Sequence, residues 1–146
     1  MTRRRATIAA LSVLIILVCI SGYIGRTPQS LSRMCSTHYD TYHVRNMLMA
    51  GENRSVLVAD TPSKWEYGLM NIQDKRDICG HDGMIFTFPI ALPQIFWNKN
   101  TLVDLDIYWM KGGKKVAEGR LSAITKSGIE TIASPGSVDA VIEIIH

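Results

Sequence analysis

The densest group of chemically capable side chains lies between Trp97 and Asp106. Asp104 and Asp106 are two residues apart, so both carboxylates face the same side if this segment is a β-strand. Such a pair performs acid–base catalysis when its environment raises one pKa, which would make the protein a glycan hydrolase. With Lys99 and Asn100, Asp106 could instead bind a small polar or carbohydrate-like ligand beside the Trp97 ring. The structural alternative is that Asp104 ends a loop and Asp106 pairs with Lys99 or accepts hydrogen bonds from backbone amides.

Metal-capable side chains form a second group. They occur at Cys35, His38, Asp40 and His43, and again at Cys79, His81 and Asp82. Their spacing matches no closed zinc-site pattern, so we expect exposed polar residues or a Cys35–Cys79 disulfide, and no metal. The methionines that could bind copper, Met47, Met49, Met70 and Met84, are expected to fill the core instead.

Two glycines stand near these groups. Gly68 and Gly83 are expected to serve the backbone conformation, through a positive φ or a close approach, rather than phosphate binding. The sequence contains no phosphate-binding loop of the G-x-x-x-x-G-K-[ST] type and no G-x-S-x-G hydrolase motif. No cofactor is therefore predicted.

The N-terminal region predicts the compartment. Arg3, Arg4 and Arg5 precede twenty residues without a charge, from Ala6 to Gly25. A helix of that length rises about 30 Å, which matches the hydrocarbon core of a bilayer. Residues 1–25 are therefore predicted to be a signal-anchor, or a signal peptide if the leader is cleaved, with the basic end expected to stay in the cytoplasm. The rest of the chain is then extracytoplasmic, where a disulfide is permitted; in the cytosol both thiols would stay free.

Charge and composition exclude other functions. The net charge is +3, and the three leader arginines account for all of it. A basic stripe with interleaved aromatic residues is absent, so no nucleic-acid partner is expected. The predicted partners are the membrane, a small polar or glycan ligand, and a protein partner if an edge strand is left unpaired.

Turn signals and alternating apolar residues predict the elements. Residues 26–42 are polar and are expected to form a stalk, and residues 43–146 a β-rich domain. Strands are predicted over 43–49, 55–60, 84–88, 94–98, 105–110, 115–124 and 138–145, with Pro89 ending the third. Thr61 and Pro62 open one short helix, with Thr61 as its cap. In the last strand the side with Asp139 and Glu143 is expected nearer solvent. The fold class is mainly β, a small antiparallel sandwich or barrel-like domain preceded by the hydrophobic helix.

Four motifs in order resemble one family. They are VLVADTP at 56–62 with GLM at 68–70, DGMIFTF at 82–88, FWNKNTL at 96–102 and LDI at 105–107. Together they resemble the domain of unknown function 192 family over Ser55 to Ile145. The resemblance implies a small, mainly-β, exported domain and no established activity. Two departures are that the family usually has methionine at the position of Asn98, and that its members usually continue beyond His146.

These observations favour a non-catalytic, membrane-tethered binding or accessory domain in the cell envelope. Its ligand-binding residues would be Trp97, Lys99, Asn100 and Asp106. The alternative is a cell-envelope hydrolase that uses Asp104 or Asp106 as acid or base.

Overall fold

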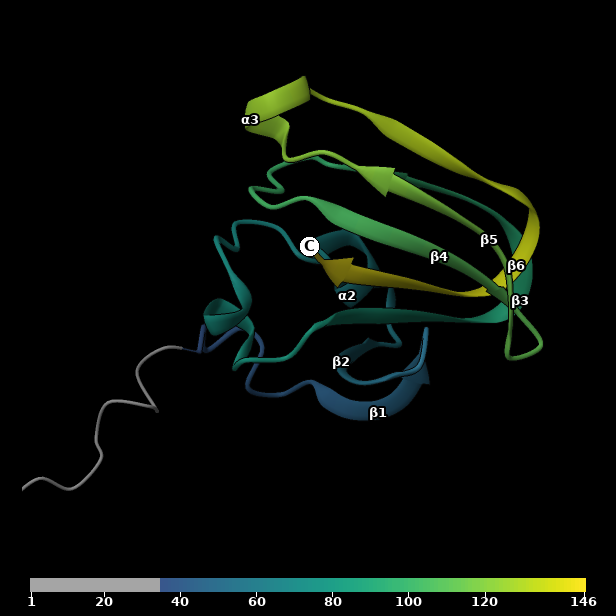
Figure 1. The fold of residues 1–146 in the computed structure, drawn as a ribbon, viewed down its shortest axis with the longest axis horizontal. Helices are drawn as coiled ribbons and strands as arrows, with labels where there is room; N and C mark the ends of the chain where they lie inside the picture. The colour runs from purple at the N-terminus through teal and green to yellow at the C-terminus, as the bar shows by residue number, and fades with distance from the viewer. Residues whose placement is uncertain (1–34) are drawn as a thin grey trace, which may run out of the picture. The chain divides into compact units, whose positions relative to one another are not determined.

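The protein forms one six-stranded mixed sheet with strand order β1-β2-β3-β6-β4-β5 (Figure 1). The computed structural model describes residues 35–146, so the predicted helix in residues 1–25 lies outside the described part. The elements, in chain order, are β1 His43–Met49, β2 Glu52–Ala59, α2 Pro62–Tyr67, the 3₁₀ helix η1 Lys75–Ile78, β3 Gly83–Trp97, β4 Leu105–Lys111, β5 Lys114–Leu121, α3 Ile124–Ser127 and β6 Thr131–Ile145. The predicted mainly-β class is confirmed. No helix between residues 35 and 146 has the length and hydropathy needed to cross a bilayer.

Two hairpins form where turns were predicted, but the loop after β1 has two residues, whereas the predicted strands left residues 50–54 between them. β1 and β2 pair antiparallel through Ala50 and Gly51, and β4 and β5 through Gly112 and Gly113. All four turn residues have positive φ, as two-residue hairpin loops that match the strand twist require. The Gly-Gly signal therefore located its hairpin correctly.

The connection from β2 to β3 differs from the antiparallel expectation. These strands pair in parallel, with Val56 opposite Gly83 and Ala59 opposite Phe86. A parallel pair needs a crossover, which α2 and η1 supply. α2 begins at Pro62 as predicted, but the Thr61 side chain makes no capping hydrogen bond. A second short helix, α3, was not predicted.

The prediction that Pro89 ends a strand was wrong. β3 runs from Gly83 through Pro89 to Trp97, and its pairing with β6 shifts register between Thr87 and Leu92 and again between Pro93 and Ile95. The prolines lie at these irregularities, where a missing N–H removes no ladder hydrogen bond.

Those shifts bend β3 back over the sheet, as the curve of β3 and β6 in Figure 1 shows. The rings of Phe86 and Phe96 meet edge to face with centroids 4.9 Å apart. A straight strand would separate residues ten apart by roughly 33 Å. Phe96 also contacts the buried Trp109 on β4. The bend therefore covers one side of the main core, the hydrophobic cluster that includes Leu57, Phe86 and Trp109.

The C-terminal half of the last strand is buried on both faces. β6 pairs with β3 on one edge and with β4 on the other. Val141 and Ile145 pack into the main core, while Ile142 and Ile144 pack into a second cluster on the other face. Glu143 is only 4% exposed, which corrects the expectation that its side lies nearer solvent. A central strand covered on both sides has no solvent face.

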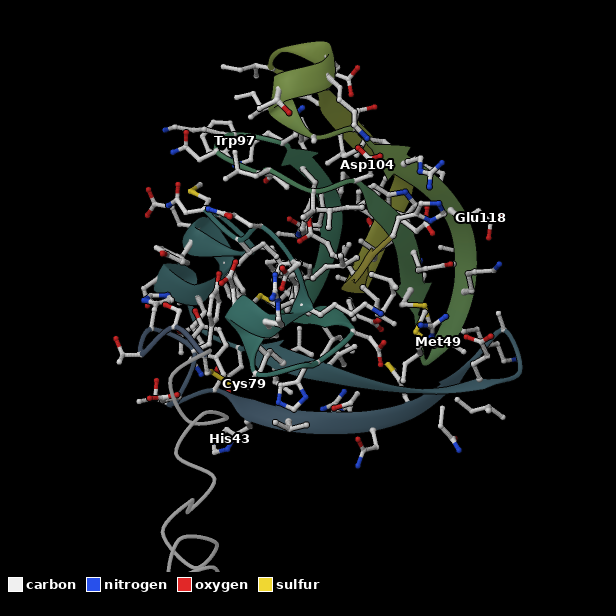
Figure 2. The ribbon with its side chains drawn as sticks, turned by 60° about the vertical axis from the view of Figure 1, so that its left-hand side comes forward. His43, Met49, Cys79, Trp97, Asp104 and Glu118 are labelled. Atoms are coloured by element: carbon white, nitrogen blue, oxygen red, sulfur yellow. A yellow bond between two sulfur atoms is a disulfide. The ribbon has the colours of Figure 1, made fainter. Side chains whose placement is uncertain are left out.

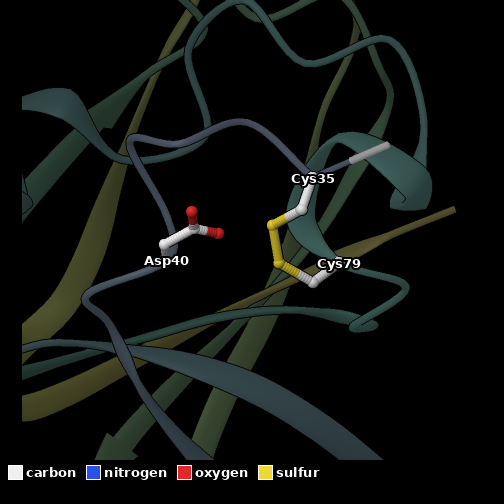
Figure 3. Close-up of side chains that lie close together, drawn as sticks. All are labelled: Cys35, Asp40 and Cys79. Atoms are coloured by element: carbon white, nitrogen blue, oxygen red, sulfur yellow. A yellow bond between two sulfur atoms is a disulfide. The ribbon is translucent and has the colours of Figure 1, made fainter. Parts of the chain in front are cut away.

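The folded domain begins earlier than residue 43. Tyr39 is 2% exposed and belongs, with Tyr42, to the main core. Cys35 is joined to Cys79 (Figure 3), and the Ser36 amide donates to the Asp77 carbonyl at 3.0 Å. Residues 35–42 are therefore part of the domain rather than of the stalk expected over 26–42.

Gly83 is required by a close approach of two strands. A Cβ at this position would lie 1.9 Å from the backbone oxygen of Glu143 and 3.0 Å from the Cα of Ile144. Because both atoms belong to the backbone of β6, neither can move alone. We expect Gly83→Ala to lower the free energy of unfolding by about 2 kcal/mol or more, measured by urea unfolding.

The matched control for that prediction is Gly136→Ala. A Cβ there meets nothing within 4 Å, so its stability should change by less than about 0.5 kcal/mol. Equal stability of the two variants would contradict the close approach.

Candidate functional site

An apolar groove lies in the bend of β3. We call it the β3 groove; it has a volume of about 330 Å³. Its lining is Trp65, Phe88, Pro89, Ile90, Leu92, Gln94, Ile95, Phe96 and Trp97. Several of these apolar side chains are open to solvent, and Ile95 is 74% exposed. A concave surface of this composition and size is typical of sites for small apolar ligands.

Trp65 forms one wall of the groove because two contacts hold it. Its indole Nε1 donates to the Ala59 carbonyl, where β2 ends, at 3.0 Å. Its ring packs edge to face on Phe88 with centroids 5.2 Å apart. α2 thus takes the place beside β3 that β2 leaves after Ala59.

A second, smaller cavity of about 30 Å³ adjoins the groove, and we call it the Glu143 cavity. It lies between the segment 65–70 and the bend of β3, and Trp65, Phe96 and Trp97 line both spaces. Lys99, Thr101 and Glu143 contribute polar side chains to its lining.

Glu143 is held in an apolar setting. Its partners across the sheet are Met84 on β3 and Ile107 on β4, both fully buried. Burial raises the pKa of Glu143 to about 8, because the charged form loses its hydration there. The side chain is therefore mainly a neutral carboxylic acid at pH 7.

Trp97 and Lys99 are brought together at the rim. The Lys99 Nζ lies 4.9 Å from the centroid of the Trp97 ring, and Trp97 is about half exposed. Figure 2 shows Trp97 at the end of the domain that carries α3. Asn100 is exposed and has a positive φ, and its carbonyl accepts from the Asn71 amide at 2.8 Å. Asn100 lines neither cavity.

Asp106 lies away from this rim. Its carboxylate pairs with Arg120 and His146, each at 3.3 Å, and it lines neither the β3 groove nor the Glu143 cavity. The structure therefore places two of the four predicted ligand residues, Trp97 and Lys99, in one site.

Asp104 holds the loop that leads into α3. One carboxylate oxygen accepts from the Ala123 amide at 2.8 Å, and the other contacts the Lys126 Nζ at 2.6 Å. The hydrogen bond from Lys126, followed by that from the Ala123 amide, keeps the pKa of Asp104 below its usual value. A general acid needs a raised pKa. These contacts favour the structural alternative for Asp104, which lies near α3 in Figure 2.

Asn98 has a structural role that the sequence did not reveal. Its buried amide nitrogen donates to the carbonyls of Ser122 and Gly128 at 2.9 and 2.8 Å, and its oxygen accepts from the Glu130 amide at 2.7 Å. These bonds tie the end of β3 to both ends of α3.

Removing those bonds without changing the size of the side chain should destabilise the domain. We expect Asn98→Leu to lower the free energy of unfolding by about 2 kcal/mol, because two carbonyls and one amide lose their partner. Thermal unfolding measures the change. Asn46→Leu, at an exposed position on β1, is the control and should have almost no effect. Equal melting temperatures would show that water replaces the Asn98 amide.

Five of the seven metal-capable side chains, Cys35, Cys79, His38, His81 and Asp82, contact other side chains or backbone groups of the chain. Cys35 and Cys79 form a disulfide with Cα atoms 4.5 Å apart, and Figure 3 shows the Asp40 carboxylate beside it. A sulfur in a disulfide is not a thiolate ligand. His38 stacks on Tyr67 with ring centroids 3.6 Å apart. His81 forms a hydrogen bond with the Ser55 hydroxyl. Asp82 accepts hydrogen bonds from the Ser55 amide and from the Arg54 and Lys75 side chains.

The methionines occupy apolar positions. Met84 is fully buried in the main core, whereas Met47 and Met49 pack against the second cluster. Met70 lines the Glu143 cavity.

Of the residues that line the two spaces, only Trp97 and Lys99 were predicted as ligand residues; those missed include Trp65, Phe88 and Glu143. Glu143 had a detectable signal, since it is the single charge between Ala140 and Ile145. An isolated carboxylate in a strand this apolar indicates a buried polar group. Trp65 and Phe88 had none, because they meet only through the crossover that places α2 beside β3.

Comparison with known proteins identifies one matching family and two solved structures with a similar fold. The DUF192 family profile, described as "Uncharacterized ACR", matches residues 45–146. A crystal structure of a candidate transcription regulator from Sinorhizobium meliloti 1021 is 28% identical, with a TM-score of 0.55 over 71% of this chain and 81% of that chain. A protein of unknown function from Novosphingobium aromaticivorans DSM 12444 has the same fold at 19% identity, with a TM-score of 0.59 over 83% of this chain and 88% of that chain. No curated protein matches the chain.

The profile match spans well over half of the chain and contains all four motifs that suggested the family. The resemblance is thereby confirmed, and the chain belongs to the domain of unknown function 192 family.

Proposed function

We propose that this domain is a non-catalytic binding or accessory module that holds a small apolar ligand in the β3 groove. The observation that carries the proposal is the groove itself: eight of its nine lining residues are apolar or aromatic, and it measures about 330 Å³. Exposed apolar side chains gathered in a concavity usually mark a binding surface.

The lining favours an apolar ligand over the polar or carbohydrate-like one predicted from the sequence. Gln94 is the one amide in the groove, and Asp106 is engaged with Arg120 and His146 elsewhere. A sugar needs several converging hydrogen-bond partners, because each unpaired hydroxyl costs free energy on burial. An aliphatic or aromatic molecule needs only the apolar walls.

The groove is tested by a small aromatic probe, toluene, at millimolar concentration or below. In the full chain in lipid nanodiscs, toluene should shift the isoleucine methyl NMR signals of Ile90 and Ile95. Trp97→Ala should weaken the apparent affinity about tenfold, since a large aromatic contact is lost. Leu48→Ala is the matched control, because Leu48 is an exposed apolar residue on β1. Shifts spread evenly over all exposed methyl groups would contradict the proposal.

We further propose that residues 1–25 tether the domain to a membrane with residues 35–146 on the extracytoplasmic side. The uncharged stretch Ala6 to Gly25 and the arginines before it support this orientation. The Cys35–Cys79 disulfide also supports it, since disulfides persist in oxidising compartments.

Fractionation tests the tether. The chain should stay with membranes in alkaline carbonate, and protease added to spheroplasts should digest the domain. Leu14→Arg, which places a charge in the apolar stretch, should release it into the soluble fraction. Recovery of the unmodified chain with cytoplasmic proteins would overturn the proposal.

The charge of the domain does not favour a nucleic-acid partner. Five of the chain's 16 basic residues lie before residue 35, whereas all 13 acidic residues follow it. The domain thus has more acidic than basic side chains, which does not favour phosphate-backbone binding. We therefore do not extend the transcription-regulator role to this chain from the Sinorhizobium meliloti protein.

A further inference from the structure

Glu143 is the one buried acidic or basic residue among residues 35–146. Within this described part its carboxyl group has no hydrogen-bond partner, whereas the buried Asn98 makes four side-chain bonds. Yet no fully enclosed side-chain oxygen in this part of the chain lacks a partner. The Glu143 oxygens therefore reach open space, and the Glu143 cavity is the space that this residue lines.

The size of the cavity limits what enters it. A volume of about 30 Å³ is close to what one or two water molecules occupy. Because Trp65, Phe96 and Trp97 line both the cavity and the β3 groove, a group in the cavity sits next to whatever occupies the groove. Only a small terminal group of a groove-bound ligand fits.

The charge of that group follows from its surroundings. An ammonium group would require an ionised Glu143 between Met84 and Ile107, where a charge has no solvation, and would meet Lys99 on the same cavity. A carboxylate group would lose its own hydration in a cavity of this size. A neutral group avoids both penalties, and burial keeps Glu143 itself neutral by raising its pKa to about 8.

A neutral carboxylic acid offers one O–H donor and acceptor lone pairs. A hydroxyl group is complementary to it, because it accepts from the acid and donates to the acid carbonyl while being no larger than water. We propose that the Glu143 cavity binds the hydroxyl group of an apolar alcohol whose hydrocarbon chain lies in the β3 groove. This inference rests on the proposed apolar-ligand function.

The test compares two isomers, 1-octanol and heptyl methyl ether, which share a formula but of which only the alcohol has an O–H. Each is titrated into the full chain in nanodiscs at pH 6 and followed by the Ile90 and Ile95 methyl signals, with affinities corrected for partition into lipid. The alcohol should bind about tenfold more tightly. In Glu143→Leu the difference should disappear, because leucine offers neither a donor nor an acceptor. Glu143→Gln, whose amide both donates and accepts, should keep a preference for the alcohol.

A variant-independent readout is the ¹³C shift of the Glu143 carboxyl carbon in the unmodified chain. It should move further on addition of 1-octanol than of the ether, which can accept from the acid but cannot donate to it. Equal affinities for the isomers, an unmoved carboxyl signal, or tighter binding of octylamine than of 1-octanol would each overturn the inference and leave the apolar groove standing. Absence of any groove binding by either isomer would overturn the proposed function as well.

Discussion

Replacing Glu143 by glutamine is expected to raise the free energy of unfolding by about 3 kcal/mol at pH 7. The ordinary pKa of 4.5 applies to the unfolded chain, and burial raises the folded value to about 8. Between these values the folded protein holds a proton that the unfolded chain has released. The free energy of unfolding of the wild type therefore falls by about 1.4 kcal/mol per pH unit in this range, because folding must take up a proton that becomes scarcer as the pH rises.

The contribution of Glu143 makes the wild type less stable as the pH rises. The contribution is fully favourable below about pH 4.5, where both states are protonated, and is lost progressively up to about pH 8. Glutamine carries no titrating proton and keeps the volume of the side chain, so the Glu143→Gln variant lacks this slope. Urea unfolding of both proteins from pH 4.5 to pH 8.5 measures the divergence.

Glu66→Gln is the matched control for that experiment. Glu66 lines the same cavity but is exposed, so its neutralisation should leave the pH profile unchanged. Parallel profiles for the wild type and Glu143→Gln would show that the carboxyl group is solvated in the folded protein, and the apolar setting derived from Met84 and Ile107 would be wrong.

Removal of the Cys35–Cys79 disulfide is expected to lower the free energy of unfolding by about 4 kcal/mol. The cysteines are 44 residues apart, and closing a loop of that length restricts the unfolded chain by about this amount in the chain-entropy description. The bridge also anchors the segment that carries Tyr39 and Tyr42 into the main core. We expect this segment to open before the sheet does when the bridge is absent.

Hydrogen exchange and thermal unfolding measure these two effects. The double variant Cys35→Ser/Cys79→Ser should melt well below the unmodified chain and lose protection at the Ser36, Tyr39 and Tyr42 amides, whose partners are backbone carbonyls. Cys19→Ser removes the third cysteine and serves as the control, because it leaves the bridge intact. If the double variant and the control melt together, the bridge does not form in solution.

Local signals in the sequence were sufficient for most of the elements. The Gly112-Gly113 turn located one hairpin, and Pro62 located the start of α2. These predictions succeeded because each depends on the conformational preference of one or two residues. The family, too, was recognised from motifs that are contiguous in the chain.

The groove could not be predicted because it depends on register. Pro89 normally indicates a strand end, and only the shift in pairing with β6 lets β3 continue past it. The same shift turns the second half of β3 back, which brings Phe96 to Phe86. Contacts made by a bend between residues far apart in the chain leave no periodic pattern.

The sequence by itself determined the mainly-β class, the hairpin turns and the family, since these follow from local backbone preferences and contiguous motifs. Only the tertiary structure decided that residues 35–42 belong to the core, that Asp104 supports α3, and that Glu143 is buried beside an apolar groove. The physical reason is that a hydrophobic cluster packs against each face of the C-terminal half of β6, which removes the solvent side that alternation in the sequence predicted.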